Sequence, residues 1–253
     1  MKQGLFTTIT MVAAMIIAAT FFWGILPGMD QGIEKTPITH QILQGGPLVP
    51  FLLTITLMLL TFVVERFMTL KKANGSAPLP TFFSNFTKAI REGRYEDASK
   101  LCDTQRGSAA AVLKAGAEQY LRTVKDKAMT TEKRLAETQR AVNEARLLEV
   151  PFLERNLIAL STIASIATMV GLLGTTIGMI RSFAAMATQG APNAAELAKG
   201  ISEALVNTAL GLFAAIIGIV AYNFFVNKVD QFNYAVDEAA YLTIEILKEK
   251  EAA

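Results

Sequence analysis

The chain has 253 residues, 52% of them hydrophobic, and a formal net charge of +2 at pH 7. With a mean hydropathy of +0.36, this composition excludes an ordinary soluble domain and favours a membrane protein. The single cysteine, Cys102, excludes an internal disulfide and a cysteine-based metal cluster. The single histidine, His40, cannot form a histidine-rich metal site, and we expect it to be an exposed loop residue.

Residues 1–29 are predicted to form an N-terminal transmembrane helix. The apolar run from Ile9 to Leu26 covers about 18 residues, whereas the apolar part of a signal peptide usually has 7–15. No clear cleavage site follows, so a retained helix is favoured and a cleaved signal segment is the alternative. Residues 30–47 are polar and contain Pro37, Gly45 and Gly46, which predicts a loop on the outer side of the membrane.

Residues 48–70 form a second predicted span, with Pro50 in the first turn, where a missing N–H costs little. Glu65 and Arg66 lie near its end, and we expect them to reach the interface as anchoring groups. Residues 71–130 have apolar side chains at helical spacing and predict a cytoplasmic region of two or three short amphipathic helices. A repeat-type pair of binding helices is the alternative for this region.

Residues 131–188 are predicted to be one long helix that includes a transmembrane span at 158–186. Its first part alternates in charge, which is typical of a solvated helix, and Pro151 is a possible kink. Residues 189–198 form an outer loop. Residues 199–253 contain a span at 199–226 and a cytoplasmic C-terminal helix, whose apolar stripe consists of Val229, Phe232, Val236, Ala239 and Leu242.

The distribution of basic residues indicates on which side of the membrane each connecting segment lies. Between Lys71 and Leu157 there are 16 Lys and Arg against 11 Asp and Glu, whereas the only basic residues in or directly beside the predicted outer links are Lys35 and Lys199. Basic residues accumulate on the cytoplasmic side of membrane proteins. Both ends of a four-span chain are therefore predicted to be cytoplasmic.

The last two spans are joined by a short link, which predicts an antiparallel helical hairpin. Lipid disfavours polar groups at this depth, yet the hairpin contains Thr175, Arg181, Glu203, Asn207 and Thr208. In its first helix, steps of three, four or seven residues place five hydroxyls on one face: Ser161, Ser165, Thr168, Thr175 and Ser182. Thr175 and Thr208 both lie about 5 Å to the same side of the bilayer centre, so antiparallel packing would place them at one level.

Small residues at helical spacing predict close packing of the two helices. In the first helix they are Gly171, Gly174 and Gly178, and in the second they are Gly211 and Gly218. Hydroxyls in membrane helices commonly bond backbone carbonyls or hold helices together, so a purely structural role for the polar residues stays open.

The hairpin segments GLLGTTIGMIRSF and GISEALVNTALGLFAAIIGIVAYNFF resemble the paired transmembrane signature of the MotA/TolQ/ExbB proton-channel family, most of all its ExbB and TolQ branch. The segment REGRYEDASKLC is similar to part of the cytoplasmic loop of ExbB. Two prolines of the family pattern are replaced, one in the stretch from Ala167 to Met169 and one at Ile217 or Gly218. The resemblance implies an all-α membrane protein with three core transmembrane helices, an extra N-terminal one, and two helices extended into the cytoplasm.

The resemblance also implies a function and a set of partners. In the family, a ring of subunits, commonly a pentamer, surrounds the single-span helices of an ExbD- or TolR-type partner in the bacterial inner membrane. The carboxylate of the partner carries protons, and the complex energises a TonB- or TolA-type effector for outer-membrane transport. By this resemblance the proton pathway is lined by Thr175, Thr208, Glu203, Thr168, Ser165 and Asn207.

Other classes find little support in the sequence. There is no P-loop, HExxH or GxSxG motif, so neither an enzyme nor a bound cofactor is expected. Basic residues are mixed with acidic ones, which argues against nucleic-acid binding. A structural membrane scaffold, a TolQ-like envelope-integrity subunit and a small-molecule transporter remain as alternatives, although a transporter would be expected to show internal repeats.

Overall fold

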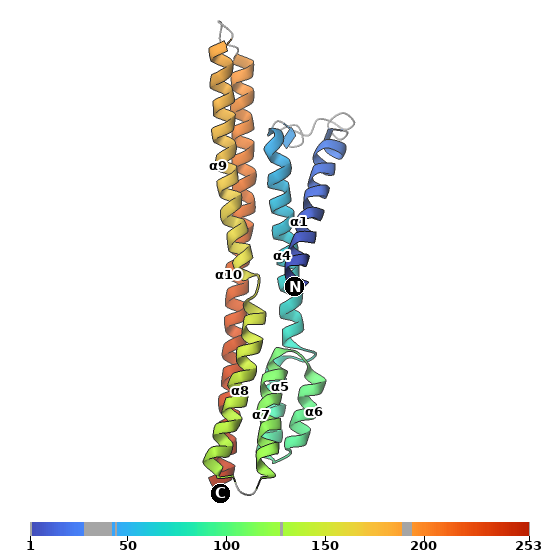
Figure 1. Ribbon diagram of the computed structural model, residues 1–253, viewed down its shortest axis with the longest axis vertical. Coiled ribbons are helices and arrows are strands. Elements are labelled where there is room, and N and C mark those ends of the chain that lie inside the picture. The colour runs from blue at the N-terminus through green and yellow to red at the C-terminus, as the bar shows by residue number, and fades with distance from the viewer. Residues whose placement is uncertain (1, 28–41, 44, 127–128, 189–193, 253) are drawn as a thin grey trace. The chain divides into compact units, whose positions relative to one another are not determined.

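The computed structural model describes residues 2–27, 42–43, 45–126, 129–188 and 194–252 (Figure 1). These residues form helices, and no strand occurs among them. The predicted all-α fold is therefore confirmed. The chain divides into two compact units, one made of Met1–Val64 with Asn156–Asn223 and the other of Glu65–Arg155 with Phe224–Ala253.

The first unit contains the helices that are most apolar. They are α1 (Lys2–Thr20) with its π-helical continuation η1 (Phe21–Ile25), the 3-10 turn η2 (Gly46–Leu48) leading into α4 (Val49–Asn74), α9 (Leu157–Thr188), and the first part of α10 (Ala194–Ala252). In Figure 1, α9 and the first part of α10 lie side by side along their length. Because residues 189–193 connect them directly, they run antiparallel.

Two buried clusters hold this unit together. In one, Phe22 and Leu26 pack on Val49, which joins the N-terminal helix to α4. In the other, Ile55 of α4 packs with Ala167 of α9 and Ala214 of α10. The alanines let three helices meet closely around one aliphatic side chain.

Four helical segments are long and apolar enough to cross a membrane: Thr8–Ile25, Gly46–Arg91, Thr131–Ala187 and Ala194–Glu251. Each has an apolar window of 18 residues with a mean hydropathy of 2.0 or more, and no more than 39% of any window is buried within the single chain. Apolar surface of this extent suits lipid or other subunits rather than water. The chain is therefore a multi-pass membrane protein with four candidate spans.

The second unit consists of shorter helices and the remainder of α10. Where two or three short helices are predicted, there are three: α5 (Leu79–Arg91), α6 (Tyr95–Gln105) and α7 (Ser108–Val124). They are followed by α8 (Thr131–Glu154). An ion pair of 2.7 Å between Arg146 Nη2 and Asp237 Oδ2 joins α8 to α10.

The long helix predicted over 131–188 is interrupted. Arg155 has an extended ψ of 139°, and Asn156 has a φ of 66°, in the left-handed region that asparagine tolerates better than most residues. Pro151 removes one backbone donor four residues earlier, which weakens the last turn of α8. The Arg155 N–H still donates to the Pro151 carbonyl at 3.1 Å, so the break follows the proline by one turn.

Arg66 differs from its predicted role as an interfacial anchor. Its side chain is buried, and its guanidinium pairs with the adjacent Glu65 carboxylate at 2.6 Å. Its Nη1 donates to the Leu153 carbonyl at 3.0 Å. This carbonyl lies in the last turn of α8, where it lacks a partner within the helix, so Arg66 caps α8.

The apolar stripe predicted after residue 226 is buried in the second unit, except at one position. Val229, Phe232, Val236 and Ala239 are buried, whereas Leu242 is 41% exposed. Leu242 lines an open groove together with Pro80 and Phe83 of α5. The predicted outer loops, including His40 and Gly190, lie outside the described residues except for their ends.

Candidate functional site

The antiparallel hairpin of α9 and α10 contains a row of close backbone contacts. A Cβ atom added to Gly211 would lie 2.6 Å from the Ala167 carbonyl oxygen and 2.8 Å from the Gly171 Cα. One added to Gly178 would lie 2.7 Å from the Gly200 carbonyl oxygen. Real Cβ atoms do not approach other atoms this closely, so only glycine fits at these positions.

Of the other three predicted packing glycines, Gly171 contacts backbone atoms of α10, whereas Gly174 and Gly218 contact side chains. A Cβ atom on Gly174 would meet the Asn207 side chain at 2.4 Å from its Cβ. One on Gly218 would lie 2.7 Å from the Ala164 Cβ and 2.9 Å from a methyl carbon of Leu59 in α4. Glycines therefore allow α9 and α10 to approach closely along most of the hairpin. At Gly218 the missing side chain also makes room for Leu59 of α4.

The predicted hydroxyl groups all donate to backbone carbonyls. Thr175 Oγ1 donates to the Leu172 carbonyl at 2.6 Å, and Thr208 Oγ1 lies 3.2 Å from both the Gly171 and Ala204 carbonyls. Gly171 and Leu172 are adjacent in α9, so the two threonines lie within about one helical turn of each other along the hairpin. Both side chains are partly buried.

Thr168 and Ser165 continue this row along α9. Thr168 Oγ1 donates to the Ala164 carbonyl at 3.2 Å, and Ser165 Oγ donates to the Ser161 carbonyl at 3.0 Å. Thr168 is partly buried and Ser165 is exposed. Bonds to the preceding turn satisfy a hydroxyl in an apolar medium, and they can be exchanged for water or a partner without loss of the helix.

Glu203 and Asn207 lie apart from this row. Glu203 Oε1 accepts from Arg181 Nη1 at 2.5 Å, and Asn207 Nδ2 donates to the Gly45 carbonyl at 2.9 Å. Glu203 is 7% exposed and Asn207 is fully buried, and the Oδ1 of Asn207 has no protein partner among the described residues. These two residues face the beginning of α4, inside the single chain.

The structure thus separates the six predicted pathway residues into two groups. Thr175, Thr208, Thr168 and Ser165 form a hydroxyl row, and Glu203 and Asn207 form a buried polar pair. The sequence alone did not identify Gly45 and Gly46 as contacts of that pair. Their only signal was a glycine doublet directly before a proline at the start of an apolar run.

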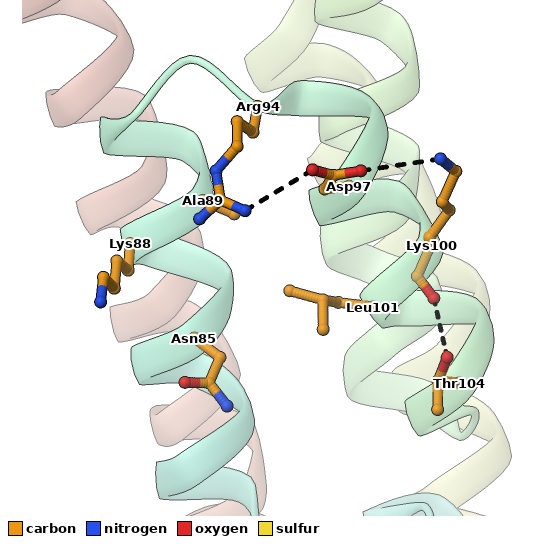
Figure 2. Close-up of a pocket in the computed structure, with 8 residues that line it drawn as sticks. All are labelled: Asn85, Lys88, Ala89, Arg94, Asp97, Lys100, Leu101 and Thr104. Atoms are coloured by element: carbon orange, nitrogen blue, oxygen red, sulfur yellow. Dashed lines mark hydrogen bonds and ion pairs between the residues drawn. The ribbon is translucent and has the colours of Figure 1, made fainter.

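The second unit contains an open pocket between α5 and α6 (Figure 2). Its volume is about 430 Å³, and its charged lining residues are Lys88, Arg94, Lys100 and Asp97. Arg94 and Lys100 each lie 3.6 Å from an Asp97 oxygen, and Arg94 also pairs with Glu92. These ion pairs are exposed, so each contributes little to the stability of the unit.

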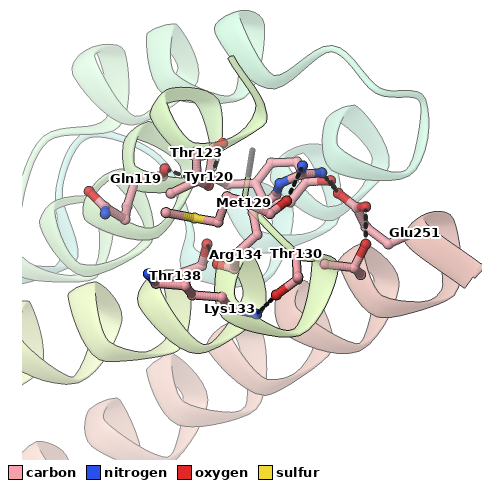
Figure 3. A network of polar contacts seen from close by, with 10 residues as sticks. Gln119, Tyr120, Thr123, Met129, Thr130, Lys133, Arg134, Thr138 and Glu251 are labelled. Atoms are coloured by element: carbon pink, nitrogen blue, oxygen red, sulfur yellow. Dashed lines mark hydrogen bonds and ion pairs between the residues drawn. The ribbon is translucent and has the colours of Figure 1, made fainter. Parts of the chain in front are cut away.

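A second polar cluster in this unit joins three helices (Figure 3). Glu251 of α10 accepts hydrogen bonds from Tyr120 at 2.8 Å, from Thr131 at 3.1 Å and from Arg134. The side chains of Arg134 and Glu251 are only 14% and 13% exposed. This network fixes the end of α10 against α7 and α8.

Among the described residues, no cluster of three or more His, Cys, Asp or Glu could hold a metal ion.

Comparison with known proteins gives consistent results. A profile of the MotA/TolQ/ExbB proton channel family matches residues 105–238, just over half of the chain. The Tol-Pal system protein TolQ of Haemophilus influenzae is 46% identical over 88 residues, which is 34% of this chain and 38% of that protein. The biopolymer transport protein ExbB of Pseudomonas putida is 44% identical over 81 residues, which is 32% of this chain and 25% of that protein.

A longer match covers the putative biopolymer transport protein ExbB-like 3 of Synechocystis sp., which is 34% identical over 140 residues, or 54% of this chain and 67% of that protein. The chain spans less than half the length of the TolQ and ExbB relatives above. The profile match includes α7, α8, α9 and α10 as far as residue 238, and therefore both helices of the hairpin. The chain belongs to the MotA/TolQ/ExbB proton channel family.

Proposed function

We propose that this chain is an ExbB-like subunit of a motor in the bacterial inner membrane that is driven by the proton motive force. Together with a single-span partner of the ExbD or TolR type, it passes protons and energises a TonB- or TolA-type effector. The observation that carries the proposal is the row of hydroxyls on the hairpin, Thr175, Thr208, Thr168 and Ser165, in a region without a free carboxylate. The only acid within the two spans is Glu203, and it is already paired with Arg181.

A proton pathway along this row requires more than one copy of the chain. One hairpin cannot enclose a path, because lipid would then contact its polar face. Several copies arranged around an axis turn the same face inward. The apolar surface of the spans supports this arrangement, because it can be shared between neighbouring subunits and lipid. We propose a homo-oligomer, with the pentamer common in the family as its form.

The proton-carrying group then comes from the partner. Neither hairpin helix supplies an acid near the middle of its span, so a carboxylate on the partner helix takes up the proton on the outer side and releases it inside. The hydroxyls give that carboxylate hydrogen-bond donors when it is charged. One elementary charge that crosses 100 mV releases about 2.3 kcal/mol, which is sufficient to drive a conformational step of the effector.

A structural scaffold is the second candidate, and one observation favours it. Every hydroxyl of the row already donates to a backbone carbonyl within the chain. In a structural scaffold the hydroxyls would need no partners other than these carbonyls. The two candidates differ in what the hydroxyls do for proton flux, since a scaffold tolerates their removal.

The oligomer is tested by native mass spectrometry of the protein extracted in mild detergent. Copies of the chain in one complex, with a single-span partner that carries an aspartate copurifying with it, would support the proposed function. A monomer at every detergent concentration in which the protein stays folded would contradict the ring. Proton uptake by the reconstituted complex then separates the motor from the scaffold.

A further inference from the structure

Arg181 and Glu203 form an ion pair between the two helices of the hairpin. Arg181 belongs to α9 and Glu203 to α10, and Nη1 of the arginine lies 2.5 Å from Oε1 of the glutamate. The arginine side chain is 51% exposed, whereas the glutamate side chain is 9% exposed. The carboxylate is therefore enclosed by the protein, and the guanidinium extends from it to the surface.

The second side of the carboxylate is covered by the beginning of α4. Gly46 has a φ of +72°, and a Cβ atom there would collide with Glu203 Oε1 and lie 2.8 Å from its Cδ. One turn further along α10, Asn207 Nδ2 donates to the carbonyl of Gly45. Glu203 and Asn207, on successive turns of α10, therefore contact the adjacent residues Gly46 and Gly45. These two contacts fix the register between α10 and the start of α4.

The burial of Glu203 makes its partner important. A carboxylate removed from water is costly unless it is paired and hydrogen-bonded. When one member of a buried pair is removed, the remaining charge has no compensation. Removal of Arg181 would therefore leave the enclosed Glu203 carboxylate uncompensated, whereas removal of Glu203 would leave an arginine that is half exposed at the surface of the subunit. The charged form of Glu203 therefore depends on Arg181 more than Arg181 depends on Glu203.

We infer that Arg181 is a positioning residue that holds the Glu203 carboxylate between α9 and Gly46 of each subunit. In this position Glu203 joins α9, α10 and the start of α4, and it is not available as a free proton acceptor. This inference rests on the proposed function only where it concerns proton transfer. The location of the ion pair within one subunit is independent of it.

The test uses the full chain in detergent and in proteoliposomes with its partner. The probe is dicyclohexylcarbodiimide, which modifies accessible protonated carboxyl groups in apolar surroundings, and modification of Glu203 is followed by peptide mass spectrometry. The variants are Arg181→Gln, Arg181→Lys, Glu203→Gln and the exchange of the two charges, Arg181→Glu with Glu203→Arg. Lys199→Gln is the matched control, because Lys199 is an exposed cation one turn before Glu203.

The inference predicts that Glu203 is modified slowly in the unaltered protein and in Lys199→Gln. In Arg181→Gln the modification rate should rise at least about tenfold, a change of about 1.4 kcal/mol in the stability of the shielded state. Arg181→Lys should restore most of the shielding. Equal modification in Arg181→Gln and the unaltered protein would overturn the positioning role, and so would equal modification in the lysine and glutamine variants.

Proton uptake supplies the second readout. The charge exchange removes the carboxylate from position 203 but keeps an ion pair, so it should retain at least about half of the uptake of the unaltered complex if Glu203 is no carrier. Should the exchange not assemble, Glu203→Gln combined with Arg181→Gln replaces it, because this pair also removes the carboxylate without leaving a buried charge. Loss of uptake in an assembled variant of either kind would show that Glu203 carries protons and would overturn that part of the inference. Absence of uptake in the unaltered complex would instead refute the proposed function, and the modification rates would still decide the role of Arg181.

Discussion

Gly211→Ala tests whether backbone contact between α9 and α10 holds the hairpin together. In the structure an added Cβ would lie 2.6 Å from the Ala167 carbonyl oxygen, 2.8 Å from the Gly171 Cα and 3.1 Å from the Gly171 nitrogen. All three are backbone atoms, so no side-chain rotation can relieve the contact. The two helices have to move apart by about 0.8 Å to restore an ordinary separation of 3.4 Å.

The magnitude follows from two opposing effects. Overpacking of a close contact costs about 1–3 kcal/mol, and a contact of backbone on backbone is at the upper end of that range. Alanine is favoured over glycine inside a helix by about 1 kcal/mol. We therefore expect Gly211→Ala to lower the free energy of unfolding by about 2 kcal/mol, or roughly thirtyfold in the unfolding equilibrium.

Two further glycines provide matched controls. An added Cβ on Gly171 would lie 3.2 Å from the Gly211 Cα and 3.3 Å from the Asn207 carbonyl oxygen, so Gly171→Ala should destabilise the protein less than Gly211→Ala does. Gly24 has no atom within 4 Å of the added position, so Gly24→Ala should be neutral or stabilising by up to about 1 kcal/mol. The assay is reversible unfolding by dodecyl sulfate in mixed micelles, followed by circular dichroism. The reasoning is refuted if Gly211→Ala is as stable as Gly24→Ala.

Three further predictions concern other parts of the chain. Burial raises the pKa of the Cys102 thiol to about 12, so a maleimide should leave the folded protein unmodified at pH 7 and react once it unfolds; rapid reaction of the folded protein would contradict this burial. The hydrogen bond from Tyr120, together with those from Arg134 and Thr131, holds the pKa of Glu251 below its ordinary value of 4.5. Because the folded-state value is the lower one, this contribution to stability is complete above about pH 4.5 and is lost as the pH falls through the folded-state pKa. Thermal unfolding should therefore show a smaller acid-dependent loss in Glu251→Gln than in the unaltered protein, and equal losses would contradict the prediction. Finally, in a Cys102→Ser background, cysteines at positions 32 and 190 should react with an impermeant maleimide from outside and those at 74 and 252 from inside, and inside labelling at position 190 would overturn the topology.

Local patterns in the sequence were sufficient to predict most of the helices. Runs of apolar residues near the bilayer thickness mark the candidate spans, and helical spacing of apolar side chains marks the short helices predicted over residues 71–130. The glycines of the hairpin were also recognisable, because small residues at such spacing commonly lie where two membrane helices meet. These features depend on residues that are close in the sequence.

Features that join distant residues could not be predicted in the same way. The sequence identified Glu203 and Asn207 as polar residues of the hairpin, but it gave no information on which helix faces them. The pairing of Asn207 with Gly45 spans 162 residues, and that of Arg66 with Leu153 spans 87. The break after Arg155 was also missed, because the left-handed conformation of Asn156 depends on its surroundings as well as its residue type.

The hydroxyl row connects the structure to the proposed function. Valine nearly matches threonine in volume, so Thr175→Val and Thr208→Val remove a hydroxyl with little change in packing. Loss of either hydroxyl leaves no buried acceptor without a donor. The carbonyls of Leu172 and Ala204, which accept from the two hydroxyls, also lie inside helices and accept from backbone N–H groups there. Assembly should therefore persist in both variants.

The most direct measurement is proton uptake by proteoliposomes that contain the complex with its aspartate-bearing partner, compared with proteoliposomes that contain this chain alone. We expect uptake only when the partner is present, and we expect Thr175→Val and Thr208→Val each to abolish it while native mass spectrometry shows an intact oligomer. Full uptake in both assembled valine variants would contradict the proposed proton pathway and leave the hydroxyls as helix-packing groups.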